Sequence, residues 1–306
     1  MLDLEDVQTF AEVAESGGLT RAAERLGLSK SIVSRRLSRL EAALGARLLA
    51  RTTRGVSLTE AGAAFLRHAE AMVSEMEAAR EAVSQGDELQ GRLRLSAPLS
   101  FGATHLGPVL AEFALRHPRL IVQTSYSDRY VDLIGERFDA AIRIGRLPDS
   151  SLIARRIAPI AIAVVASPGY IARHGEPQSP QDLQGPDAIG QPDEIWRFGE
   201  GARAIAIRPR FRLQADSGQA LIAAAVAGVG VAMLPTFLCG PAIASGELVP
   251  LLLDQPIPEA GLYVVRPPPA EPAPRKVRRL IELLLERFGG ELVWDVCYEA
   301  RRRATA

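Results

Sequence analysis

Residues 20–59 constrain the fold of this chain more than any other stretch of its sequence. Thr20 can cap a short helix, and Gly27 would end it after two turns. Ser29 stands where the N-cap of a second helix belongs, and Gly45 stands where that helix would end. Between them one apolar stripe recurs at helical spacing, at Val33, Leu37, Leu40 and Leu44. The stretch therefore predicts two helices joined by a tight turn.

The outer face of the second helix carries side chains that can hydrogen-bond to a nucleic acid. At about 100° per residue, serines and arginines fall opposite the apolar stripe or on its flanks. They are Ser31, Ser34, Arg35, Ser38 and Arg39. Hydroxyl and guanidinium groups of this kind bind base edges in the major groove of DNA. A short helix, a turn and such a second helix predict a DNA-binding helix-turn-helix.

Basic residues are concentrated in the same stretch. Between Arg21 and Arg54, nine lysines and arginines oppose two acids, a local formal charge of +7 in a chain whose net charge is zero. Such a patch can bind DNA by displacing counterions from its phosphates. The alternative is a solvated basic face on an ordinary helical bundle, since many charged helix faces have no binding role. Residues 46–49 and 56–58 read as two short strands joined by a polar turn, so Arg51 and Arg54 would lie on a wing close to the DNA backbone.

A long helix without proline is expected from Thr59 to about Ser84, followed by a hinge at residues 84–88. It carries a narrow heptad stripe, at Phe65, Ala69, Met72, Met76, Ala79 and Val83. We expect that a stripe this narrow cannot be buried within its own small domain and needs a partner helix. Dimerisation would hold two reading helices on two half-sites, and a helix packed in the core is the alternative.

From Gly91 onward, strand patterns alternate with helix patterns, which predicts an α/β domain with parallel strand order. Strands are expected at 92–97, 120–126, 139–144, 160–166, 208–213, 229–234 and 263–265. Helices are expected at 129–137, 217–227 and 276–288, among others. The segment after Gly289, which ends in Arg301-Arg302-Arg303, is by default a disordered basic tail.

Composition and motifs argue against several classes of protein. With 306 residues, 47% of them apolar and 24% charged, we expect a soluble globular protein of at least two domains. The acidic start MLDLEDV is unlike a secretory signal and the apolar runs are too short for a membrane span, so we expect a cytoplasmic protein. Cys239 and Cys297 have no metal-ligand spacing, and the four histidines are scattered. Without GxSxG, P-loop or GxGxxG motifs after a strand, we expect no catalytic residue, metal or cofactor, and hence no enzyme.

Motifs along most of the chain match one known family. In the first part the matching residues are Ala22-Ala23, Leu26, Ser29, Val33-Ser34, Leu40-Glu41, Leu44-Gly45, Leu48, Arg51-Thr52 and the run 58–62. In the second part they are the runs 96–102, 139–145, 166–170 and 227–235. Over about residues 2–288 the chain resembles the LysR-type transcriptional regulators.

The resemblance implies an α/β fold preceded by an all-α winged helix-turn-helix. We expect a DNA-binding domain at residues 1–58, a dimerisation helix with a hinge at 59–90, and an effector-binding domain at 91–306. The effector-binding domain would consist of two subdomains of the periplasmic-binding-protein type. Subdomain I would span about 91–161 and 266–290, and subdomain II about 162–265.

The effector site is expected where open α/β sheets bind ligands, beyond the carboxyl ends of their strands. The family's pocket is formed by these strand ends, which makes five residues candidates: Ser100, Phe101, Asp128, Arg143 and Trp196. Each also has a structural alternative. Ser100 and Asp128 can cap helices, Arg143 can pair with an acid, and Trp196 can belong to the core.

The sequence is thus interpreted as that of a sequence-specific transcription regulator whose activity is modulated by a small anionic or aromatic effector. Ser31, Ser34, Arg35 and Ser38 would read bases of double-stranded DNA, and Lys30, Arg39, Arg51 and Arg54 would hold phosphates or groove walls. The resemblance further implies a homodimer through the long helix, assembled into a homotetramer, with RNA polymerase as a further candidate partner. The alternative is a small-molecule-binding module of the solute-binding type with a vestigial DNA-binding domain.

Overall fold

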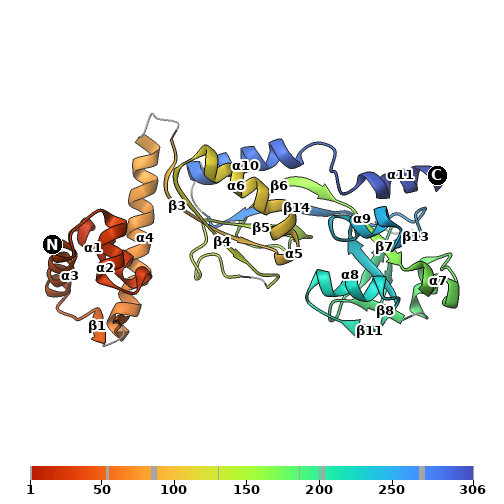
Figure 1. Cartoon of the computed structure of the whole chain (residues 1–306), viewed down its shortest axis with the longest axis horizontal. Helices are drawn as coiled ribbons and strands as arrows, with labels where there is room; N and C mark the ends of the chain where they lie inside the picture. Colours follow the sequence, from red (N-terminus) through yellow and green to blue (C-terminus); the bar gives the residue numbers. More distant parts are fainter. Residues whose placement is uncertain are drawn as a thin grey trace. The chain divides into compact units, whose positions relative to one another are not determined.

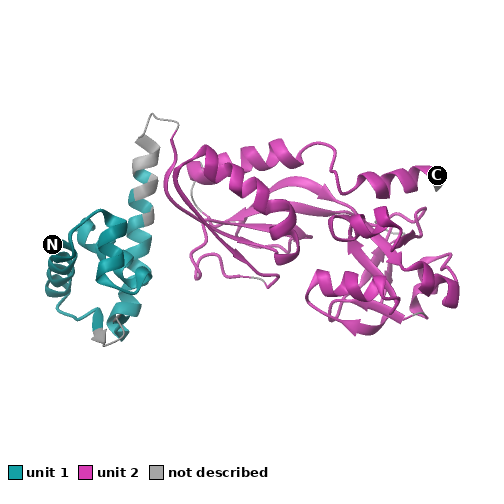
Figure 2. Ribbon diagram, in the orientation of Figure 1, with its two compact units in different colours: residues 1–87 teal, residues 88–306 magenta. Residues whose placement is uncertain are grey.

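The chain is divided into two compact units, residues 1–87 and 88–306, in its computed structural model (Figure 2). The structure describes residues 2–52, 55–83, 88–129, 131–185, 187–199, 201, 204–268 and 273–305. We describe each unit separately. Among the residues described, no helix is both long and apolar enough to cross a lipid bilayer.

The first unit contains four helices and a two-stranded ribbon in its described part (Figure 1). They are α1 Leu4–Ser16, α2 Leu19–Leu26, α3 Lys30–Leu44, β1 Leu49–Thr52, β2 Gly55–Leu58 and α4 Glu60–Val83. Helix α3 begins and ends as predicted, because the Ser29 hydroxyl accepts the Ile32 N–H at 3.3 Å and Gly45 takes a left-handed φ of 65°. Helix α2 instead begins after Gly18, so Thr20 lies inside its first turn and does not cap it.

The core of the first unit is built from α1, α2, α3 and the first turns of α4. The Phe10 ring of α1 lies 5.6 Å from the Phe65 ring of α4, Ala69 is buried, and Met72 packs against the same cluster. The expectation that the whole heptad stripe needs a partner helix is therefore wrong for its first half, because α1 already covers it. Met76 remains half-buried and Ala79 exposed further along α4.

The first half of the second unit is a five-stranded sheet in the order β4-β3-β5-β14-β6. Its strands are β3 Gln90–Ala97, β4 Arg119–Tyr126, β5 Ala140–Gly145, β6 Ile153–Ile160 and β14 Ala260–Arg266. Its helices are α5 Leu99–Phe101, a π-helical turn Gly102–Leu106, α6 Gly107–Arg116 and α10 Arg275–Phe288. Strand β3 is parallel to β4 and β5, whereas β14 is antiparallel to β5 and β6, so the sheet is mixed and not wholly parallel.

The second half has a sheet in the order β11-β8-β12-β7-β13 and a small ribbon, β9-β10. The strands are β7 Ile162–Ala166, β8 Asp187–Gly190, β9 Trp196–Phe198, β10 Ile205–Ile207, β11 Arg210–Gln214, β12 Val231–Pro235 and β13 Val249–Leu251. The helices are α7 Pro168–His174, a 3-10 turn Pro180–Gln184, α8 Gly218–Val226 and α9 Thr236–Ser245. The chain passes between the halves at Ala161 and again between β13 and β14.

Four expectations for the second unit need correction. The expected strand 160–166 is two strands that part at Ala161, and β14 pairs within the first sheet, which shortens subdomain II to about residue 259. Residues 131–137 form turns and no helix, because the Asp132 carboxylate accepts the N–H groups of Ile134 and Gly135 at 3.1 and 3.0 Å. The tail is ordered rather than disordered and forms helix α11, Val296–Thr305.

Candidate DNA interface and ligand cavity

Helix α3 presents a polar outer face opposite its buried stripe. Lys30, Ser31 and Arg35 are exposed, and Ser34 is half-buried. Neither Lys30 nor Arg35 forms an ion pair with any residue that the structure describes. The face predicted to read bases is thus accessible and cationic. Because Ser29 fixes the first turn, the side chains that follow it are held in a defined direction.

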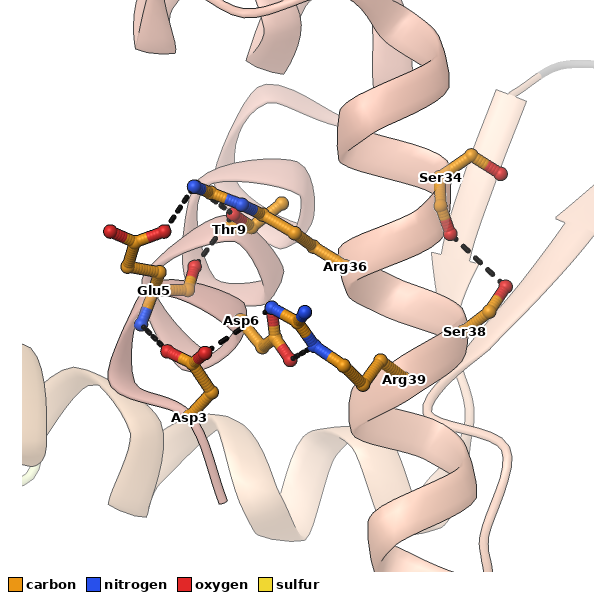
Figure 3. Close-up of polar contacts among 8 residues, drawn as sticks. All are labelled: Asp3, Glu5, Asp6, Thr9, Ser34, Arg36, Ser38 and Arg39. Carbon is orange, nitrogen blue, oxygen red and sulfur yellow. Dashed lines mark hydrogen bonds and ion pairs between the residues drawn. The ribbon is translucent and has the colours of Figure 1, made fainter. Parts of the chain in front are cut away.

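The hydroxyls on this face are partly engaged within the helix. Ser31 Oγ lies 2.9 Å from Ser29 Oγ, and the Ser38 hydroxyl donates to the Ser34 carbonyl oxygen at 3.0 Å (Figure 3). The Ser38 hydroxyl therefore uses its proton within the helix in this arrangement, and only its oxygen lone pairs can bind a base. Such a hydroxyl can accept a hydrogen bond from a base amino group.

Arg39 lies differently from the other predicted DNA contacts. Its Nε and Nη2 each donate to the buried carboxylate of Asp6 at 2.5 Å, and Nη2 also lies 3.3 Å from the Asp3 carboxylate (Figure 3). These hydrogen bonds raise the pKa of the Arg39 guanidinium. Arg39 thus joins α3 to α1 in this arrangement, although it was predicted to hold a phosphate.

Arg36 makes a similar link between the same two helices. It pairs with Glu5, and its Nη1 donates to the Thr9 hydroxyl at 3.4 Å (Figure 3). Arg25 also pairs with Glu12 of α1 at 3.0 Å, so three of the nine basic residues in the patch form ion pairs with acids of α1. Sequence reasoning missed the links of Arg36 and Arg39 because Glu5 and Asp6 lie about thirty residues before their partners, outside any helical spacing.

The ribbon β1–β2 corresponds to the predicted wing: its first strand begins at Leu49 and not at residue 46, and its second strand begins one residue earlier than predicted. Leu49 pairs with Leu58 and Thr52 with Gly55 in an antiparallel register. Arg51 lies in β1 with its side chain outside the described part, and Arg54 lies outside the described residues altogether. The Glu41 carboxylate accepts the N–H groups of Leu48 and Leu49 at 2.8 and 3.1 Å, which fixes the wing to α3.

A cavity of about 480 Å³ lies between the two halves of the second unit. It opens at the carboxyl ends of β3, β4 and β5, as predicted, and it brings together Ser100, Asp128 and Arg143. The Asp128 carboxylate also accepts the Leu99 N–H at 2.9 Å, so it holds the start of α5. That is the structural alternative considered for this residue, and the two functions are compatible because a carboxylate has further acceptor sites.

Phe101 and Trp196 do not line this cavity. Phe101 is fully buried in the core of the first half, between the rings of Phe237 and Trp294 at 5.2 and 5.7 Å. Trp196 is also buried, in the core of the second half, where its ring lies 6.2 Å from that of Phe211. Large aromatic side chains remove the most apolar surface from water, and here that favours the core over the cavity.

Three further charged residues, which were not among the five candidates, line the cavity: Arg146, Glu194 and Arg197. Arg146 follows the third strand directly, so the strand-end rule that selected Arg143 was applied too narrowly. Glu194 and Arg197 come from a loop and a short strand of the second half, the segment 191–198 from which Trp196 was selected as the candidate. Burial raises the pKa of Glu194, although its carboxylate accepts the Gln191 N–H at 2.8 Å.

Family comparisons match both units. The model described as "Bacterial regulatory helix-turn-helix protein, lysR family" matches residues 4–63, and "LysR substrate binding domain" matches residues 86–289. The chain belongs to the LysR family of bacterial regulators. Members of this family are transcriptional regulators and not enzymes. The match to both domains favours a regulator over a solute-binding module with a vestigial DNA-binding domain.

Individual relatives support the same conclusion over the full length. The transcriptional regulator PtxR of Pseudomonas aeruginosa is 38% identical over 296 residues, which cover 95% of this chain and 94% of PtxR. The structure of CrgA, a LysR-type regulator from Neisseria meningitidis, is 34% identical with a TM-score of 0.59 and covers 94% and 99% of the two chains. The virulence activator AphB of Vibrio cholerae is 26% identical with a TM-score of 0.56, covering 95% and 100%.

This LysR-type regulator therefore combines a helix-turn-helix DNA-binding domain with an effector-binding α/β domain. The matched domains assign DNA binding to the first unit and effector binding to the second. The effector-domain match ends at residue 289, so the segment that contains α11 lies beyond it.

Proposed function

We propose that α3 reads base edges in the major groove, with Ser31, Ser34, Arg35 and Ser38 as the contacts that specify sequence. The single observation that supports this most is the exposed face of α3, on which Arg35 has no ion pair among the described residues. Arg35 is free to form the two-pronged hydrogen bond to guanine that arginine makes most often. The serine hydroxyls add shorter-range contacts beside it.

We assign phosphate binding to the remaining basic residues of the patch. Lys30 stands at the first position of α3, where the helix N–H groups also attract an anion. Arg51 and Arg54 on the wing complete this set by sequence position. Arg39 is bound to Asp6 in the free protein, so we assign it a weaker contribution to phosphate binding, dependent on its release from that carboxylate.

The oligomer is proposed to form through α4. Phe65, Ala69 and Met72 are used within the unit, which leaves Met76 and Ala79 as the stripe available to a second copy. Pairing there would join two reading helices in one homodimer, and the family resemblance favours a homotetramer of two such dimers. We assign the protein to the cytoplasm, with RNA polymerase as a further partner.

The effector is proposed to be a small organic anion, aromatic or aliphatic. Arg143, Arg146 and Arg197 face the cavity together with three acids, Asp128, Glu194 and Asp216. Two of these acids are poor competitors for the arginines, because Asp128 already accepts the Leu99 N–H and burial raises the pKa of Glu194. An anionic ligand would meet arginines from both halves, and this is a way for it to bias their relative arrangement.

DNA recognition is tested by salt-dependent binding of the purified protein to the DNA upstream of its own gene, with a scrambled fragment as the control. We expect preference for the native fragment and a steep fall in affinity with salt. Equal affinity for both fragments at every salt concentration, for folded protein, would contradict sequence-specific recognition there.

The effector class is tested by thermal shift with benzoate and succinate and, as neutral controls, benzamide and succinamide. A carboxylate present at 100 times its dissociation constant would stabilise the fold by about 2.7 kcal/mol. We expect stabilisation by at least one acid and by neither amide. Stabilisation by the amides to the same degree would contradict an anionic site.

A further inference from the structure

The C-terminal segment 289–305 runs from one half of the second unit to the other. It leaves α10, which packs on the first sheet, and ends in α11, which packs on α9 of the second half (Figure 1). Leu292 is buried in the core of the first half, whereas Tyr298 is buried in the core of the second. The segment thus anchors one apolar side chain in each half.

On the first half, the segment packs behind the wall of the cavity. The Trp294 ring lies 4.6 Å from the His105 ring and 5.7 Å from the Phe288 ring. His105 Nε2 in turn lies 3.3 Å from the carbonyl oxygen of Phe237, a residue that lines the cavity. Trp294 therefore supports Phe237 indirectly, through the imidazole of His105.

Where the chain crosses between the halves, two side chains of the segment, Asp295 and Tyr298, form hydrogen bonds with the surrounding residues. The Thr236 hydroxyl oxygen lies 3.1 Å from the carbonyl oxygen of Ala161, to which it is hydrogen-bonded. It is also hydrogen-bonded to the Asp295 carboxyl group. The Tyr298 hydroxyl donates to the Ile162 carbonyl oxygen at 3.4 Å. Ala161 separates β6 of the first sheet from β7 of the second, so the segment holds the crossover itself.

The sequence of α9 accommodates this passage. A Cβ atom at Gly240 would lie only 2.6 Å from the Trp294 carbonyl oxygen, too close for any residue with a side chain. Glycine costs stability inside a helix, so its presence at this close approach is explained by the segment that crosses there.

We propose that residues 289–305 act as a strap that restrains rotation of the two halves about their crossovers and supports the rear wall of the cavity. Two chain crossovers alone form a hinge, and a third connection limits the angles it can adopt. Asp295 and Tyr298 are the positioning residues of this strap. The strap bears on effector binding only through the proposed function of the cavity, because the ligand's affinity depends on how often the binding arrangement is populated.

The strap is tested by pulsed dipolar spectroscopy on the full chain, with spin labels at Asp149→Cys in the first half and Glu176→Cys in the second. Both positions are exposed, and Cys297→Ser removes the exposed native thiol. An excess of unlabelled chain suppresses distances between subunits. We expect Asp295→Ala and Tyr298→Phe to give a distance distribution roughly twofold broader than that of the parent chain.

Val293→Ala is the matched control, because Val293 belongs to the same segment but is 87% exposed. It should leave the distribution unchanged. An unchanged distribution in Asp295→Ala and Tyr298→Phe, with thermal unfolding as cooperative as in the parent, would overturn the proposal, as would equal broadening in Val293→Ala. If Asp295→Ala fails to fold, Tyr298→Phe decides, because it removes one oxygen atom and keeps the ring. Neither DNA nor effector is present, so this result is independent of the proposed function.

Discussion

Asp6 and Arg39 join α1 to α3 by two parallel hydrogen bonds of 2.5 Å each. The side chain of Asp6 is buried, whereas that of Arg39 is 56% exposed and turned toward α1. This pair orients α3, and it also engages one cation of the basic patch with an acid of α1. Removing the acid should therefore affect both stability and DNA binding.

We predict that Asp6→Asn lowers the melting temperature and steepens the salt dependence of DNA binding. The freed Arg39 can then reach a phosphate, which adds roughly one unit to the slope of log affinity against log salt. Glu24→Gln changes the net charge equally at an exposed acid of α2 and serves as the control. A slope that changes by the same amount in both variants would show that only the overall charge matters.

Substitutions of Arg35 and Lys30 are predicted to weaken DNA binding in different ways. Arg35→Ala should weaken the specific fragment roughly 10- to 100-fold and random DNA far less, because it removes a base contact. Lys30→Ala should weaken both fragments alike and reduce the salt slope by about one, because it removes a phosphate contact. Fluorescence anisotropy with both fragments at several salt concentrations separates the two patterns. Equal losses for Arg35→Ala on both fragments would contradict base reading.

Dimerisation through α4 predicts that a charge at its exposed stripe separates the subunits. Ala79→Glu would place two like charges across the dimer axis, and we expect the dissociation constant of the dimer to rise roughly tenfold or more. Ala71→Glu introduces the same charge on α4 outside the stripe and is the matched control. Sedimentation equilibrium measures both variants, and equal dissociation constants would locate the dimer contacts elsewhere in the chain.

The two cysteines should react at very different rates. Burial raises the pKa of the Cys239 thiol to about 12, so at pH 8 almost none of it is the nucleophilic thiolate, whereas Cys297 is exposed. Mass spectrometry after iodoacetamide treatment should find one label per native chain and two in denaturant. Cys297→Ser should leave the native chain unlabelled. Two labels on the native chain at comparable rates would mean that α9 opens readily.

Local signals in the sequence were sufficient for the bounds of α3, although they misplaced the start of α2. Ser29 and Gly45 define α3 because a cap and a left-handed glycine act within one turn of the helix. The packing of α1 against Phe65 of α4 could not be predicted in the same way. It depends on a contact between helices some fifty residues apart, and a heptad stripe looks alike whether its partner is another copy or its own chain.

The position of the cavity was predicted from the sequence, but only three of the five candidate residues line it. Ser100 and Asp128 follow β3 and β4 closely, and Arg143 lies in the second half of β5, so topology alone brings them to one edge. Phe101 and Trp196 are adjacent in sequence to residues that line the cavity, but their side chains point into the cores. Strand β14 was assigned to the wrong subdomain because short apolar runs carry no information about which sheet they join.

The contacts that hold α3 in place are concentrated on the side that faces α1 and at its end, through Arg36, Arg39 and Glu41. Arg35 and Lys30 are exposed, and neither forms an ion pair with a described residue. Under the proposed base-reading role of Arg35 and Ser31, the preferred operator can diverge by substitution at these exposed positions while the domain keeps its stability. A duplicated copy of this gene could acquire new target sites in few mutational steps, and the same positions are the rational starting point for redirecting the protein to a chosen DNA sequence.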